Sequence, residues 1–192
     1  MKRTRDGMPR VDFLGTGNAF SPPGRMHALA LIDDSILIDT PPTLLAQLRR
    51  SGFSGSDIEH ILFTHWHGDH IFGFPFLMLD RKYISDREGK ASLDVYLRPG
   101  GIDILESLCR SGFPGSLESL DHIIDWHESE YDEIGDTGWK FYRFPVLHNP
   151  DTDPHGYELV HESGFRLLHC GDSGPCDEID NRAKRADVII VE

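Results

Sequence analysis

Long hydrophobic runs are missing from this sequence. No stretch approaches the roughly 18 consecutive apolar residues that a membrane-spanning helix needs. The first ten residues carry several charges but no apolar segment of the kind that secretory signals contain. We therefore expect no membrane partner and a cytoplasmic location.

Cysteine and positive charge are also scarce. The three cysteines, Cys109, Cys170 and Cys176, are too few for a disulfide framework and suit a reducing compartment. Lysine and arginine number 19 against 32 acidic residues, which gives a formal net charge of -13. Because phosphate contacts need clustered cations, this balance is not typical of a general nucleic-acid binder, although a local basic patch is compatible with it.

Internal repeats, low-complexity tracts and an interdomain linker are absent as well, so the 192 residues predict one domain over 1–192. Apolar runs between turn residues predict strands at 11–14, 28–32, 35–38, 61–63, 94–97, 123–126, 139–145, 157–161, 165–170 and 188–191. Helices are predicted at 43–50, within 71–79 and at 102–111. This mixture indicates an α/β (α+β) layered fold.

The strongest signal is a cluster of metal-binding residue types directly after an apolar strand. Four potential ligands fall within six residues: His65, His67, Asp69 and His70. In an extended segment, side chains two residues apart point the same way, so His65 and His67 can reach one metal. Gly68 is expected to make a sharp turn that directs Asp69 and His70 toward a second metal. Imidazole and carboxylate ligands suit zinc, and also manganese or iron.

These residues form the pattern HxHxDH, which resembles the signature of the metallo-β-lactamase superfamily. The run 67–75 and the segment 13–17 are similar to those of the ribonuclease Z branch, and Tyr96 followed by 99–102 resembles a strand-to-helix crossing of that branch. The resemblance extends over nearly all of the chain. It implies the four-layer αβ/βα sandwich of the superfamily, with two sheets face to face.

The resemblance also assigns roles to residues outside the signature. His148 matches the third ligand of the first metal, and Asp172 matches a carboxylate that bridges both metals. Asp39 matches an aspartate that braces the ligand loop, as outer carboxylates do for ligating histidines. Taken without the resemblance, a strand-end histidine, a turn-forming aspartate and a capping aspartate are the ordinary alternatives.

The resemblance breaks at the end of the chain. A two-metal member needs a further histidine after 187–192, and the ribonuclease Z group pairs Glu192 with a catalytic histidine downstream. We expect a chain truncated after the strand near 191, which would lack the C-terminal part of the fold. A ligand from another subunit and a weakly held second metal are the alternatives. His155, close in sequence to His148, is the best candidate for a substrate contact.

The function implied by the resemblance is metal-dependent hydrolysis. Two divalent metals activate a water, and Asp69 orients it toward a phosphodiester of a nucleotide, a cyclic phosphate or an RNA 3′ end. The partner is then a small-molecule or nucleotide substrate, with RNA possible, and a homodimer is plausible by analogy. The same metal core could instead hydrolyse carboxylic esters, thioesters or lactones. A non-catalytic metal-binding module is the alternative from another class.

Overall fold

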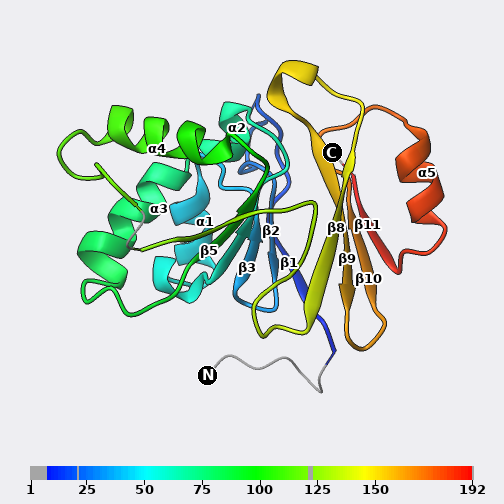
Figure 1. Ribbon diagram of the computed structural model, residues 1–192, viewed down its shortest axis with the longest axis horizontal. Coiled ribbons are helices and arrows are strands. Elements are labelled where there is room, and N and C mark those ends of the chain that lie inside the picture. The colour runs from blue at the N-terminus through cyan, green and yellow to red at the C-terminus, as the bar shows by residue number, and fades with distance from the viewer. Residues whose placement is uncertain (1–7, 21, 121–122, 192) are drawn as a thin grey trace. The chain divides into compact units, whose positions relative to one another are not determined.

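The computed structural model describes residues 8–20, 22–120 and 123–191 (Figure 1). The chain divides into two compact units. Apart from residues near the N-terminus, the first unit comprises 10–63 and 68–128, and the second comprises 64–67 and 129–192. The short segment 64–67 therefore leaves the first unit and the chain then returns to it. The single domain over residues 1–192 stays a prediction.

The first unit is built on a six-stranded sheet in the order β1-β2-β3-β4-β5-β6. The pairs β1–β2 and β2–β3 are antiparallel, and the pairs from β3 to β6 are parallel. The strands are β1 (Val11–Gly15), β2 (Leu29–Ile32), β3 (Ile36–Ile38), β4 (His60–Leu62), β5 (Asp94–Leu97) and β6 (Asp125–Glu128). Every residue of the neighbouring strands β2, β3 and β4 is buried.

The strands predicted at 28–32 and 35–38 form an antiparallel hairpin as β2 and β3. Three residues separate the strands, and the first two of them, Asp33 and Asp34, have left-handed φ values of 46° and 66°, as tight hairpin turns often need. Aspartate tolerates this conformation better than most residues do. The predicted strand at 123–126 lies two residues further on, as β6.

The helices of the first unit are α1 (Leu44–Arg50), α2 (Gly68–Ile71), α3 (Phe74–Asp80) and α4 (Gly101–Gly112), with a 3-10 turn at Gly55–Asp57 and a π-helical turn at Arg81–Ser85. Figure 1 shows α1, α3 and α4 on one face of the sheet. The helix predicted within 71–79 is divided at Gly73. A Cβ on Gly73 would lie 2.1 Å from the carbonyl oxygen of Pro41, so the chain approaches too closely for a side chain.

The second unit contains a five-stranded sheet in the order β11-β10-β9-β8-β7. Its elements are β7 (Tyr131–Glu133), β8 (Trp139–Pro145), a 3-10 turn at Pro150–Thr152, β9 (His155–His161), β10 (Arg166–His169), α5 (Asp177–Ala183) and β11 (Val188–Ile190). All pairs are antiparallel except β10–β11, which α5 connects. The sequence analysis missed β7 and α5, because one is short and polar and the other contains few apolar residues.

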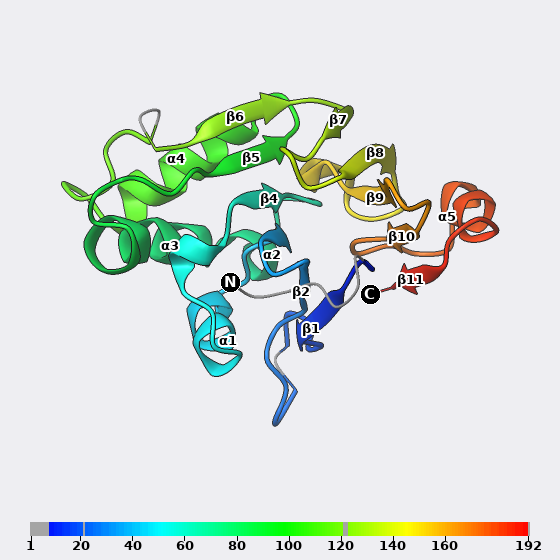
Figure 2. The same ribbon diagram turned by 90° about the horizontal axis from the view of Figure 1, so that it is seen from below.

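Helix α5 covers part of one face of this second sheet, as Figure 2 shows. Ile179 and Ala183 pack against a small core formed by Phe144, Leu168 and Cys170. The three cysteines are free, as expected. Burial raises the pKa of Cys170 to about 11 and that of Cys109 to about 12, so both thiols are protonated at neutral pH. Among the described residues, no helix combines the length and the apolar character needed to cross a membrane.

Candidate metal centre

The loop that carries His65 and His67 is bound to the second unit through its backbone. The N–H of His155 donates to the carbonyl oxygen of Thr64 at 2.9 Å, and the N–H of Trp66 donates to that of Thr152 at 3.1 Å. These bonds attach the loop to the start of β9 and to the turn before it. The two histidines are therefore held beside the ends of the strands of the second unit.

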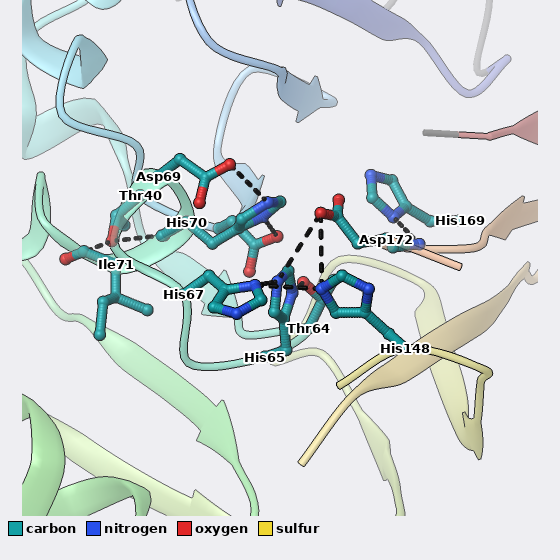
Figure 3. A network of polar contacts seen from close by, with 12 residues as sticks. Thr40, Thr64, His65, His67, Asp69, His70, Ile71, His148, His169 and Asp172 are labelled. Carbon is teal, nitrogen blue, oxygen red and sulfur yellow. Dashed lines mark hydrogen bonds and ion pairs between the residues drawn. The ribbon is translucent and has the colours of Figure 1, made fainter. Parts of the chain in front are cut away.

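Three imidazoles and one carboxylate converge at this place (Figure 3). The Nδ1 atom of His67 lies 3.0 Å from the Nε2 atom of His65 and 3.0 Å from the Nε2 atom of His148. The Oδ2 atom of Asp172 lies 3.9 Å and 3.8 Å from the same two Nε2 atoms. One ligand atom from each of the four residues lies within 4.8 Å of all the others. We call these four residues the second-unit cluster.

The rings of the second-unit cluster are nearly perpendicular to one another. Their centroids are 4.8 to 5.0 Å apart, and the interplanar angles are 82° to 88°. Ligands held about 2.0–2.1 Å from a tetrahedral zinc ion lie about 3.3 Å apart, close to the distances seen here. The single in-plane site on His67 Nδ1 can form only one ordinary hydrogen bond, although two ring nitrogens approach it. Both observations fit a divalent cation that takes a lone pair from each ring.

The segments that present His148 and Asp172 are paired with each other. Leu147 and Gly174 form an antiparallel bridge, in which the N–H of Gly174 donates to the carbonyl oxygen of Leu147 at 2.8 Å. The N–H of Leu147 also lies 3.3 Å from the Oγ atom of Ser173. This bridge fixes the two ligands relative to one another, although they are far apart in the sequence.

Three residues that the sequence analysis missed help to position the ligands. The hydroxyl of Thr64 lies 3.0 Å from the Nδ1 atom of His65, and the backbone N–H of Gly171 donates to the Nδ1 atom of His169 at 3.2 Å. Gly171 has φ of 59°, and a Cβ there would lie 3.0 Å from the carbonyl oxygen of His155. The glycine before Asp172 was the available sequence signal, because glycine accepts this conformation without strain.

The first unit holds a separate pair formed by Asp69 and His70. The Nε2 atom of His70 lies 3.4 Å from the Oδ2 atom of Asp69, and its Nδ1 atom lies 2.8 Å from the Oδ2 atom of Asp39. Asp39 and His70 each have a side chain that is only 4% exposed. The backbone N–H of Thr40 donates to the carbonyl oxygen of His70 at 2.7 Å. Asp39 thus lies within hydrogen-bond distance of His70, and its role in bracing the ligand loop stays a prediction.

The expected sharp turn at Gly68 is wrong, because Gly68 is the first residue of helix α2. A Cβ on Gly68 would lie 2.4 Å from a ring atom of Phe72, one turn further along. Asp69 and His70 therefore belong to a helical turn, and not to a loop after a bend.

Two predicted site residues remain outside these groups. His155 begins β9, is 6% exposed and donates from its Nδ1 atom to the carbonyl oxygen of Asp153 at 2.8 Å. Its contact with a substrate stays a prediction. Glu192 lies outside the described residues, and its catalytic role stays a prediction too.

Comparison with known proteins agrees with this arrangement. Among solved structures, the metallo-β-lactamase-fold protein YhfI of Bacillus subtilis matches with a TM-score of 0.75 at 16% identity, over 94% of this chain and 70% of that one. The structure is thus a mixed α/β fold of the metallo-β-lactamase type, as predicted. A family model described as Beta-lactamase superfamily domain matches residues 34–192. The chain belongs to the metallo-β-lactamase superfamily.

The chain is also similar to other proteins in sequence. An uncharacterized protein of Mycobacterium leprae is 31% identical over 169 residues, which cover 80% of this chain and 55% of that protein. A ribonuclease Z of Methanothermobacter thermautotrophicus is 32% identical over 124 residues, which cover 63% of this chain and 38% of that enzyme. The chain therefore spans about half or less of the length of these relatives. The superfamily implies divalent metal binding, and the structure contains a histidine and aspartate cluster suited to it.

Proposed function

We propose that this protein is a hydrolase that depends on divalent metal ions. The second-unit cluster carries this proposal, because its four ligand atoms lie close together without any rearrangement. A first cation would be held by the Nε2 atoms of His65 and His148, by the Nδ1 atom of His67 and by the carboxylate of Asp172. A second cation would be held at the Asp69–His70 pair. Zinc suits both donor sets best, and manganese and iron also fit.

Neighbouring residues prepare these ligands for a cation. If His65 donates its Nδ1 hydrogen to the hydroxyl of Thr64, its Nε2 lone pair is free for the cation. In the same way, Asp39 accepts the Nδ1 hydrogen of His70 and leaves Nε2 as the ligand atom. Each histidine then carries its hydrogen on Nδ1, which is the tautomer that a cation at Nε2 requires.

A divalent cation in such a site supplies Lewis-acid chemistry, since it makes water nucleophilic at neutral pH and stabilises charge on a substrate oxygen. Asp69 would accept a hydrogen bond from the attacking water and so orient it. Glu192 is the proposed partner of a proton donor for the leaving group. His155 is proposed to contact the substrate.

The proposed substrate is a phosphodiester, in a nucleotide, a cyclic phosphate or an RNA 3′ end. The support is the similarity to proteins named ribonuclease Z. Hydrolysis of a carboxylic ester, thioester or lactone is the second candidate, because the same donor set can activate water for attack on a carbonyl carbon. The homodimer remains an expectation from the family resemblance, and the cytoplasmic location remains an expectation from the sequence composition.

The test combines metal analysis with two substrates. Elemental analysis should find two divalent ions per chain, and the protein should hydrolyse bis(p-nitrophenyl) phosphate but not a lactone. Lactone hydrolysis alone would replace the first reaction with the second. A chain that binds no metal and hydrolyses neither compound would contradict the enzyme proposal and favour a non-catalytic module.

A further inference from the structure

A basic pocket lies on the face of the second sheet that α5 covers only in part. Its volume is ≈350 Å³, and its lining includes Lys140, Tyr142, Glu158, Arg166, Arg182 and Arg185. Strand pairing puts these residues on one face, because Tyr142 is opposite Glu158 and Arg166 is opposite Val160, which is opposite Lys140. Helix α5 covers Phe144, Leu168 and Cys170 further along the same face.

Three guanidinium groups in this pocket converge on a single buried carboxylate. The side chain of Glu158 is 7% exposed and accepts hydrogen bonds from Arg166 at 2.9 Å and from Arg182 at 2.8 Å. Arg185 lies 3.3 Å from the same carboxylate. One arginine would balance the charge of Glu158, and Arg182 also pairs with Glu178, so the third guanidinium exceeds what these ion pairs need.

The excess positive charge is local in a chain whose formal net charge is -13. Four cations line the pocket with one carboxylate. Two further acidic groups lie at its edge, since Glu178 pairs with Arg182 at 2.9 Å and Asp187 accepts the backbone N–H of Arg166 at 2.8 Å. Because Glu158 holds the guanidinium groups in place, their remaining N–H donors are pre-organised for an anion. Arginine in such an array is suited to phosphate oxygens.

An aromatic surface adjoins these cations. Tyr142 lines the pocket and is 38% exposed. Its ring centroid lies 4.8 Å from that of Tyr131, which is 48% exposed. Exposed aromatic rings beside cations are typical of surfaces that stack a nucleic-acid base while they bind its phosphate.

The neighbouring hollow argues for a small ligand. It shares Lys140 and Val160 with the basic pocket, but Glu133, Asp136 and Glu162 also line it. These carboxylates would repel the next phosphates of an extended strand. We propose that the basic pocket binds the phosphate groups of a single nucleotide, with its base on Tyr142, at a site that does not use the metal ligands.

Calorimetric titration of the metal-loaded protein tests this proposal with three probes: adenosine diphosphate, inorganic pyrophosphate and an RNA decamer. Arg185→Ala should weaken the binding of the first two probes by about tenfold or more, because a charge-assisted hydrogen bond is lost. Lys184→Ala is the matched control, since Lys184 directly precedes Arg185, is exposed and does not line the pocket. It should change the affinity by less than about threefold, as expected for a screened charge.

Tyr142→Leu should weaken the binding of adenosine diphosphate about tenfold through lost stacking, and leave pyrophosphate binding unchanged. Equal effects of Arg185→Ala and Lys184→Ala, or no saturable binding at millimolar concentration, would overturn the proposal. Decamer binding that is tighter than nucleotide binding would assign the surface to RNA instead.

Lys140→Ala is a second pocket variant in case Arg185→Ala lowers the melting temperature. Phosphodiester hydrolysis by Arg185→Ala should match that of the unsubstituted protein. The hydrolase proposal can therefore fail or hold independently of the nucleotide-binding proposal.

Discussion

The second-unit cluster and the Asp69–His70 pair of the first unit contrast in how they are assembled. The cluster takes its four ligands from three segments that backbone hydrogen bonds and a β-bridge hold together. The pair comes from adjacent residues of one short helix, and a single buried carboxylate, Asp39, lies within hydrogen-bond distance of it. Tertiary structure thus forms the cluster, whereas local sequence forms the pair. The two should therefore differ in their sensitivity to substitution.

The largest expected effect comes from a ligand of the cluster. His67→Ala removes the imidazole that lies 3.0 Å from both other rings, so it should abolish metal binding at the cluster. Hydrolysis should fall by more than about 100-fold, because the loss of an outer partner alone costs about 10- to 100-fold. His161→Ala, in the same unit, should keep both metal content and activity. Full metal content in His67→Ala by elemental analysis would contradict the ligand assignment.

A smaller effect is expected for the first-unit pair. Asp39→Asn keeps the shape of the side chain but removes the charge that orients His70, so the affinity for a second cation should fall by about 10- to 100-fold. The measurement is a competition titration with a chelator that follows the second equivalent of metal. Asp33→Asn is the control, since Asp33 lies in the β2–β3 turn. If both variants lose affinity equally, Asp39 does not position His70.

The backbone near the cluster can be tested through stability. Gly171→Ala places a Cβ 3.0 Å from the carbonyl oxygen of His155, whereas a Cβ on Gly164 meets nothing within 4 Å. Both glycines have positive φ, so Gly164→Ala should cost about 1 kcal/mol of unfolding free energy, and Gly171→Ala should cost about 2 kcal/mol or more. Denaturant unfolding measures both. Equal costs would show that the close approach at Gly171 is not important.

The smallest effect concerns the pH dependence of the first unit. Burial lowers the pKa of His60 below its usual value of 6.5. Asp94, whose Oδ2 atom lies 3.1 Å from the Nδ1 atom of His60, opposes this lowering of the pKa, and so does Glu59. His127 contributes slightly to the lowering. The unfolded chain therefore binds a proton that the folded chain resists, so stability should fall as the pH drops below 6.5. His60→Gln should flatten this dependence between pH 7 and 5 in denaturant titrations. A slope equal to that of the unsubstituted protein would contradict the assignment.

These contrasts explain what could be predicted from the sequence. His65, His67, Asp69 and His70 form a compact pattern, so local spacing alone indicated a metal site, and strong apolar runs indicated the strands β5 and β8 at their observed bounds. His148, Asp172 and Asp39 required the family resemblance, because a lone histidine or aspartate after a strand has common structural roles. The positioning roles of Thr64 and His169 could not be predicted, since they depend on contacts that form only when distant segments meet. The arginines around Glu158 were missed for the same reason.

The ligands of the second-unit cluster gather where β8 and β10 end, whereas the turns at 134–138 and 162–165 lie at the other end of the same strands. The loops at the ligand end of the sheet must therefore keep their length, whereas the turns at the other end can vary in length. Residues inserted into the turn around Ser163 extend into solvent and leave the register of β9 with β10 intact. Residues inserted between His169 and Gly174 would displace Asp172 from the rings. Evolution of this unit is thus expected to lengthen one end of the sheet and to preserve the other.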